Sequence, residues 1–202
     1  KAGDTLNLAV GKDPSYSVIW AERARVRAET NDLPGALGDI AKAVELDPLV
    51  YSHWVDYGNY LISSLKKDEA REAFSRAIKI DPNQYLAYIY RAGINDDLGD
   101  AEGAISDYSA ICRLFPQYYY AAESLGILLW GKGDFAGSRA AFIQALEHNT
   151  KNVSYALMIT LCYYREKNDA AAKNFMAKYI TTLDRNGTEY FLCRLFVDRS
   201  GD

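Results

Sequence analysis

The sequence has few of the residues from which active sites and metal centres are built. It contains two histidines, His53 and His148, and three cysteines that lie far apart in the chain. No cysteine or histidine has a partner at the spacing of a metal-binding motif. The 14 glycines are scattered, and none belongs to a glycine-rich loop that could hold a phosphate group. We therefore expect a non-enzymatic protein with no catalytic residues, no metal site and no cofactor.

We expect no chemical role for the few histidines and cysteines. His53 stands near the start of a predicted helix and His148 near the end of another, and both are expected on the surface. Cys112, Cys162 and Cys193 fall within predicted helices, where we expect free thiols that fill core space. An odd number of separated cysteines favours a reducing compartment such as the cytoplasm. A periplasmic or lipid-anchored location, with an upstream signal missing from this chain, stays open.

Strong positive charge and long apolar segments are also missing. The formal net charge is −4 and the isoelectric point is about 5.3, which argues against the basic surface of a nucleic-acid-binding protein. No run of 18 apolar residues is present, so no direct membrane insertion is expected. Hydrophobic residues make up 49% of the chain, enough to form a continuous core.

What the sequence does contain is a repeat. Pro14, Pro48, Pro82 and Pro116 follow one another at intervals of 34 residues, and Thr150 takes the next place. Other positions recur with the same period, which indicates one structural unit copied end to end. Small residues stand 24 places before this position at Ala24, Gly58, Ala92 and Gly126. Large residues stand eight places before it at Ile40, Phe74, Tyr108 and Phe142.

Each copy is predicted to form two helices. In the copy at 51–84, the recurring positions are spaced as on one helix face and place the helices at about 52–64 and 68–80. Asp-Pro ends the second helix, because proline cannot continue a helix and disfavours helical angles in the residue before it. Small residues on the shared face let the two backbones approach closely, and large residues opposite them fill the remaining space.

The turn between the two helices is expected seventeen places before each proline position. A helix end there often needs a residue that tolerates the left-handed conformation. Asn31, Gly99, Gly133 and Gly201 fit this requirement. Leu65 and Lys167 occupy the same place in their copies and do not fit it, so the pattern leaves those two turns open.

This pattern resembles the tetratricopeptide repeat. The copy at 51–84 matches it best, through Trp54, Gly58, Ala70, Phe74 and Pro82. The resemblance covers essentially all 202 residues and implies an all-α fold, a right-handed α-solenoid (superhelix) of antiparallel helix pairs. The predicted array consists of a half repeat 1–16, full repeats 17–50, 51–84, 85–118, 119–152 and 153–186, and a C-terminal half repeat or capping helix 187–202.

The two ends of the chain continue the repeat in phase. Residues 1–16 fit only a second helix, and residues 187–202 fit only a first helix. We interpret the chain as a fragment of a longer protein, and natural end caps are the alternative for the two half units.

The family resemblance implies a binding surface on the first helices, which line the concave side of such arrays. Here the stripe is largely apolar and aromatic, with acidic residues along it, and an exposed patch of that composition usually marks an interaction site. The expected peptide-binding groove consists of Asn59, Ile62, Leu86, Ile89, Tyr90, Asp96, Tyr120, Glu123, Ile127, Trp130, Leu157, Leu161 and Tyr164. The same stripe also passes through the small residues Ala21 and Val55, and Asp56 lies on its edge.

Another reading of the stripe is that it belongs to the core. First helices could pack against one another, or the apolar helix predicted at 188–198 could fold back and fill the groove. We expect the open groove, and so a protein–protein interaction scaffold whose partner is a peptide or helix with apolar and basic residues. Two alternatives stay open: a substrate-recruiting segment of a larger enzyme, and a self-associating assembly module.

One specialisation of the family can be tested on the sequence. Co-chaperones of this type hold the C-terminal carboxylate of a chaperone with lysine, asparagine and arginine on successive first helices. Asn59 has a matching place, but Leu86 and Tyr90 stand where a lysine and an arginine would be needed. The chain is therefore not expected to bind chaperone tails.

Overall fold

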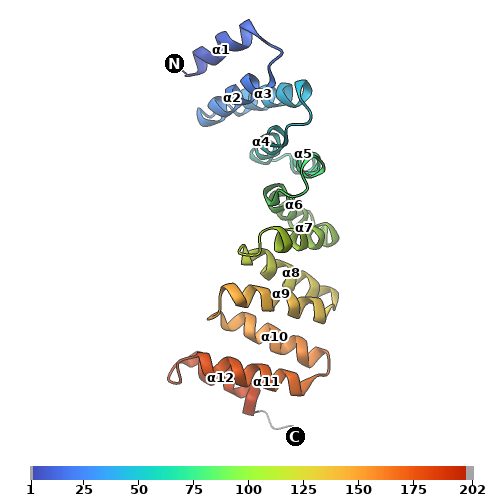
Figure 1. Cartoon of the computed structure of the whole chain (residues 1–202), viewed down its shortest axis with the longest axis vertical. Helices are drawn as coiled ribbons and strands as arrows, with labels where there is room; N and C mark the ends of the chain where they lie inside the picture. Colours follow the sequence, from blue (N-terminus) through green and yellow to red (C-terminus); the bar gives the residue numbers. More distant parts are fainter. Residues whose placement is uncertain (1, 199–202) are drawn as a thin grey trace. The chain divides into compact units, whose positions relative to one another are not determined.

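The computed structural model describes residues 2–198, and these are helices joined by turns, with no strand among them. They divide into two compact units, one up to residue 100 and one from residue 101. Figure 1 labels the α-helices in chain order. The first unit contains α1 (Ala2–Lys12), α2 (Ser17–Glu29), α3 (Leu33–Leu46), α4 (Tyr51–Ser63), α5 (Lys67–Ile80) and α6 (Tyr85–Leu98). The second contains α7 (Ala101–Leu114), α8 (Tyr119–Lys132), α9 (Phe135–His148), α10 (Val153–Arg165), α11 (Asp169–Tyr179), the 3-10 helix η1 (Ile180–Thr182) and α12 (Thr188–Asp198).

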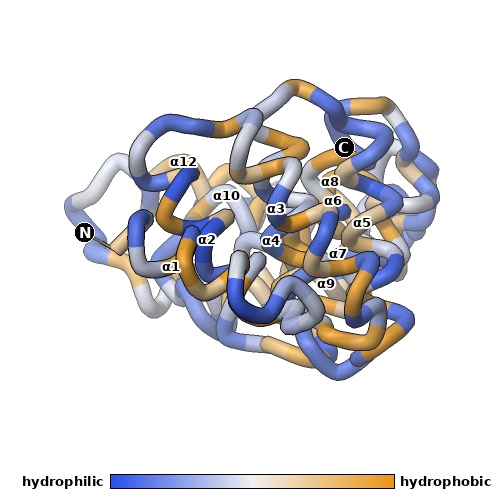
Figure 2. Tube along the Cα trace, turned by 90° about the horizontal axis from the view of Figure 1, so that it is seen from above, coloured by the Kyte–Doolittle hydropathy of each residue, from blue (hydrophilic) through white to orange (hydrophobic). Residues whose placement is uncertain are grey.

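Within each unit, every helix packs against the helix that follows it in the chain. Hydrophobic and hydrophilic stretches alternate along the helices, so each helix can bury one face and leave another in water (Figure 2). The helices predicted at 52–64 and 68–80 are α4 and α5, which begin one residue earlier than expected. Each unit is therefore built by adding neighbours along the chain, without a core that gathers distant segments.

A small residue on the first helix of a repeat meets a large residue on the second. A Cβ atom added to Gly58 would lie 2.6 Å from the ring of Phe74, and one added to Gly126 would lie 2.8 Å from Phe142. Phe74 is completely buried and Phe142 almost so. The predicted packing of a large residue against a small one is confirmed at these two places, where a Cβ atom would clash with the ring.

The proline that separates repeats is tied to the helix that follows it. The indole nitrogens of Trp20 and Trp54 donate to the carbonyl oxygens of Pro14 and Pro48, at 2.9 Å in both cases. Tyr88 makes the corresponding bond to Pro82 through its hydroxyl group, at 3.3 Å. The recurring aromatic position therefore carries a polar donor because the donor satisfies a carbonyl group at the turn.

The turns inside the repeats share one backbone conformation. Asn31, Gly99 and Gly133 adopt the left-handed conformation that was expected of them, with φ of 62°, 73° and 80°. Leu65 and Lys167 adopt it as well, with φ of 61° and 59°. The geometry of the helix pair therefore overrides the preference of these two side chains. The remaining expected position, Gly201, lies outside the described residues.

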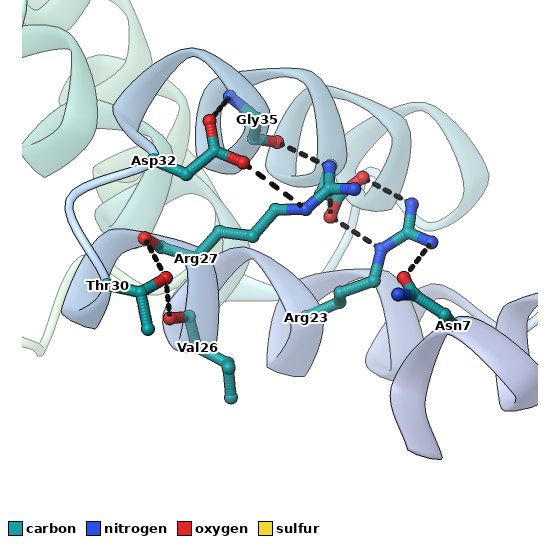
Figure 3. Close-up of polar contacts among 8 residues, drawn as sticks. Asn7, Arg23, Val26, Arg27, Thr30, Asp32 and Gly35 are labelled. Atoms are coloured by element: carbon teal, nitrogen blue, oxygen red, sulfur yellow. Dashed lines mark hydrogen bonds and ion pairs between the residues drawn. The ribbon is translucent and has the colours of Figure 1, made fainter. Parts of the chain in front are cut away.

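A buried carboxylate on α3 holds a network of contacts that reaches α2 and α1. Asp39 of α3 is 3% exposed and accepts two hydrogen bonds from Arg23 of α2, at 2.6 and 2.7 Å. Arg27 lies 2.9 Å from the same carboxylate, and Arg23 also donates to Asn7 of α1 at 3.1 Å (Figure 3). The hydrogen bond to Asp39 raises the pKa of Arg23, although burial acts against it. These contacts satisfy a charge that would otherwise be costly to bury.

Removing the carboxylate should destabilise the first unit strongly. Asp39→Ala leaves Arg23 and Arg27 without their common partner, and we expect a loss of about 3 kcal/mol in the free energy of unfolding. Asp68→Ala breaks an exposed pair with Arg71 and should cost less than about 1 kcal/mol. Urea denaturation of both variants measures the difference, and equal losses would contradict the importance of the buried network.

Two glycines of the first unit should respond to alanine with opposite signs. Gly58→Ala forces a methyl group into the buried ring of Phe74 and should destabilise the protein by about 1–3 kcal/mol. Gly93 lies within α6 with open space around it, so Gly93→Ala should stabilise the protein by about 0.5–1 kcal/mol through helix propensity. Thermal unfolding of the two variants tests this, and a stabilised Gly58→Ala would show that the close approach is not limiting.

Candidate interaction surfaces

The second unit presents the most exposed of the apolar and aromatic residues in the predicted groove. Tyr120 and Ile127 of α8 are 54% and 56% exposed. Glu123 lies between them in the sequence and is half-buried. Positions separated by three and four residues lie on one side of a helix, so these three side chains form a continuous strip along α8. The α8 strip, defined as Tyr120, Glu123 and Ile127, combines an aromatic ring, a carboxylate and an aliphatic group.

The carboxylate of the α8 strip is held in place by α10, the first helix of the following repeat. The hydroxyl group of Tyr155, on α10, donates to Oε2 of Glu123 at 2.8 Å. Burial and the neighbouring carboxylate together raise the pKa of Tyr155, so its proton stays on the phenol. The bond from Tyr155 thus orients Glu123, and the carboxylate can accept further hydrogen bonds.

Aromatic rings cluster at the start of the same helix. The ring of Tyr120 lies 4.3 Å from that of Tyr119 and 5.7 Å from that of Tyr118, measured between ring centroids. Tyr118 in turn stacks on Phe115, with centroids 6.3 Å apart. These contacts limit the freedom of Tyr120 before any partner arrives, which lowers the entropy lost when its ring is covered.

Trp130, at the other end of α8, lies against its own unit. Its ring meets Phe135 of α9 edge to face at 5.0 Å, and the guanidinium group of Arg165 lies 5.8 Å from it. Trp130 is half-buried, so its contacts stabilise the packing of α8 against α9 and α10. Of the predicted groove residues on α8, it is therefore the least suitable probe of binding.

The predicted groove residues of α10 are partly covered by α12. Leu157 packs against a buried cluster that includes Met176 and Cys193, and the hydroxyl group of Tyr164 donates to the carbonyl oxygen of Phe196 at 3.3 Å. Leu161 is half-buried. The helix expected at 188–198 thus bonds to Tyr164 and shares a core cluster with Leu157, while the α8 strip keeps its exposure.

The first unit holds the other six predicted groove residues. Leu86 and Asp96 of α6 are exposed, and the remaining four are half-buried: Asn59, Ile62, Ile89 and Tyr90. Ile62 and Tyr90 pack on the core cluster around Phe74, with the rings of Tyr90 and Phe74 stacked 5.1 Å apart. Ala21 and Val55, which the stripe also includes, are buried. In this unit the stripe therefore serves partly as core.

One expectation about the histidines is wrong. His148 is exposed as expected, but His53 is only 4% exposed, and its Nε2 atom lies 3.4 Å from Oγ of Ser17. His53 points from α4 towards Ser17 of α2, and this side of α4 is buried. Burial lowers the pKa of His53, so the ring stays neutral at neutral pH.

Asp56, on the edge of the stripe in the first unit, is a half-buried carboxylate without an ion pair among the described residues. Burial raises its pKa, and Arg25 and His53 act in the opposite direction. A raised folded-state pKa means that the stabilising contribution of this group is present below its unfolded pKa and is lost as the pH rises through the folded value.

Neutralising Asp56 should therefore stabilise the protein at neutral pH. We expect Asp56→Asn to raise the unfolding temperature at pH 7, with the gain shrinking as the pH falls towards the ordinary aspartate value of ~3.9. Glu29→Gln removes the same charge from an exposed position and serves as the control. Calorimetry at several pH values checks this, and a gain that is constant with pH would contradict it.

The described residues offer no metal site and no membrane span. No group of three or more histidine, cysteine or acidic side chains among them could hold a metal ion. Cys112, Cys162 and Cys193 are free thiols, and the last two are buried. Burial raises the pKa of the Cys112 thiol to about 11, so the thiol stays protonated at neutral pH. None of the helices found between residues 2 and 198 is long and apolar enough to cross a membrane.

Known proteins with similar sequences contain the same kind of helix-pair repeat. A family model described as tetratricopeptide repeat matches residues 21–85, 55–119 and 124–181. Among curated proteins, a TPR repeat-containing protein of Methanocaldococcus jannaschii is 26% identical over 129 residues, which are 63% of this chain and 23% of that protein. The BBSome complex member bbs-4 of Caenorhabditis elegans is 26% identical over 168 residues, 83% of this chain and 36% of that protein. The chain thus spans about a quarter to a third of the length of these relatives.

Solved structures show the same fold. YrrB, described as a TPR protein with an unusual peptide-binding site, superposes with a TM-score of 0.69 at 16% identity, over 96% of this chain and 99% of that chain. The MamA protein superposes with a TM-score of 0.64 at 16% identity, over 84% of this chain and 92% of that chain. Identities this low establish the architecture alone, which is an all-α solenoid.

Proposed function

The chain belongs to the tetratricopeptide repeat family, and from this premise we propose that its second unit binds a segment of a partner protein along the α8 strip. Proteins of this family are generally interaction scaffolds. The observation that carries the proposal is the exposure of Tyr120 and Ile127 on one side of α8, with the carboxylate of Glu123 between them. Large apolar groups that stay in water on a folded surface usually mark a place where a partner covers them.

The strip favours a partner segment that carries one aliphatic anchor and one arginine or lysine. An aliphatic side chain placed on Ile127 would gain about 1.5–3 kcal/mol before the loss of conformational entropy is subtracted. A guanidinium group can stack on the ring of Tyr120 and bond to Glu123 at the same time. The hydrogen bond from Tyr155 supports this arrangement because it fixes the direction of the carboxylate.

Selection of random peptides displayed on phage tests the proposal directly. We expect the wild-type chain to enrich sequences with an arginine or lysine close to an aliphatic residue. Binding of the selected peptides should weaken at least about tenfold in the double variant Tyr120→Ala/Ile127→Asp. The matched control is Leu49→Asp/Leu65→Asp, which removes two exposed aliphatic groups from the first unit.

Thermal unfolding of both double variants accompanies the binding measurement. Both sets of side chains are exposed, so both variants should keep the wild-type unfolding temperature within about 2–4 °C. A selected peptide that binds the α8 double variant as tightly as the wild type would contradict the proposal that the α8 strip is the binding site. Trp130 is left unchanged because its contacts with Phe135 and Arg165 mix stability with binding.

The two alternative roles use the same kind of surface. Recruitment of a substrate to a larger enzyme would also place a protein segment on the α8 strip, and self-association would place a second copy there. Sedimentation over a range of concentrations distinguishes self-association from the other two roles. If the wild-type chain associates through the strip, the Tyr120→Ala/Ile127→Asp variant should not associate.

A further inference from the structure

A hollow of about 440 Å³ opens between the second helices α9 and α11. Its walls are apolar, with Ile143 and Leu146 on α9 and Phe175 and Tyr179 on α11. These residues belong to second helices, whereas the α8 strip belongs to a first helix, so the hollow is a separate feature of the second unit. Its volume lies within the range of about 300–1,000 Å³ that is usual for sites of small ligands.

The aromatic wall comes from a departure in the fifth repeat. Tyr179 stands where Ala43, Ala77 and Ala145 stand in other copies, five places before the proline position. Its ring stacks on Phe175, with centroids 6.4 Å apart and planes 9° from parallel. Tyr179 is only 6% exposed, so most of the aromatic surface that a ligand could meet belongs to the half-buried ring of Phe175.

The rim of the hollow carries two lysines and one glutamate, and so a net positive charge. Lys151 and Lys178 border the opening together with Glu147, and none of the three makes an ion pair among the described residues. Lys151 also borders a neighbouring hollow that contains Asp184 and Glu189, so these acids compete for it. Lys178 is therefore the cation best placed to meet an anionic group of a ligand in the larger hollow.

We infer that the hollow between α9 and α11 binds a small amphiphile, with an alkyl or aromatic body and a single carboxylate or sulfonate group. The body lies against Leu146 and Phe175, and the anionic group pairs with Lys178 at the rim. This site is independent of the proposed protein-binding role of the α8 strip.

Two fluorescent probes that differ in one group test the inference. The anionic probe is 8-anilino-1-naphthalenesulfonate, and the uncharged probe is N-phenyl-1-naphthylamine, which lacks the sulfonate. Titration of the folded wild-type chain should show one saturable site for each probe, and dodecanoate should displace the anionic probe. Lys178→Gln should weaken the anionic probe about fivefold and leave the uncharged probe unchanged.

Control variants locate the site. Thr150→Trp places a large side chain on the exposed rim and should abolish binding of both probes, with the unfolding temperature measured to show that the chain stays folded. Lys167→Gln changes an exposed lysine outside the hollow, and Ile127→Asp changes the α8 strip, so neither should affect the titrations. Binding that does not saturate, that survives Thr150→Trp, or that responds equally to Lys178→Gln and Lys167→Gln would overturn the inference.

Discussion

The close fit between a small residue on one helix and a large residue on the next is the contact on which the rest of this structure depends. Gly58 and Gly126 have no space for a Cβ atom because the rings of Phe74 and Phe142 lie against their backbones. In the fifth repeat the same two places hold Thr160 and Met176, both fully buried. The first residue is larger there and the second is not aromatic, which is consistent with a roughly constant filled volume. A helix pair set by such a fit repeats with little change along the chain.

Stacking of equal helix pairs leaves surfaces that differ in what they can do. The first helices turn one side towards water, and on α8 this side keeps Tyr120 and Ile127 exposed. On α10 the corresponding side is partly covered, because α12 packs there as a further first helix would. The second helices lie apart at α9 and α11 and leave a hollow of small-ligand size. One unit thus carries both the α8 strip that we propose as a protein-binding surface and the hollow that we infer to bind a small molecule.

Much of the fold could be predicted from the sequence, because the period of 34 residues and the spacing of small and large side chains are local signals. The left-handed turns at Leu65 and Lys167 could not, since tertiary packing overrides the preference of these residue types. His53 was placed wrongly for a related reason. Its position near a helix start suggested exposure, but the face it occupies is covered by the neighbouring first helix.

The candidate sites were less predictable than the fold. The sequence placed thirteen groove residues on one stripe, yet exposure along the stripe depends on what each helix packs against, which a periodic pattern does not contain. Ala21 and Val55 are buried, and Trp130 is engaged with Phe135. The hollow on the second helices was missed altogether. Its one signal in the sequence is Tyr179 at a place where other copies have alanine, and such a departure gives no sign of a cavity.

A double-mutant cycle on Gly126 and Phe142 is the most direct test of the small-to-large fit. Gly126→Ala inserts a methyl group against the ring, and Phe142→Leu removes the ring that it meets. The account predicts that the two changes are coupled. The double variant should lose less free energy of unfolding than the two single variants lose together, by at least about 1 kcal/mol. Free energies of unfolding that add without coupling would contradict the fit as the contact that sets the helix pair.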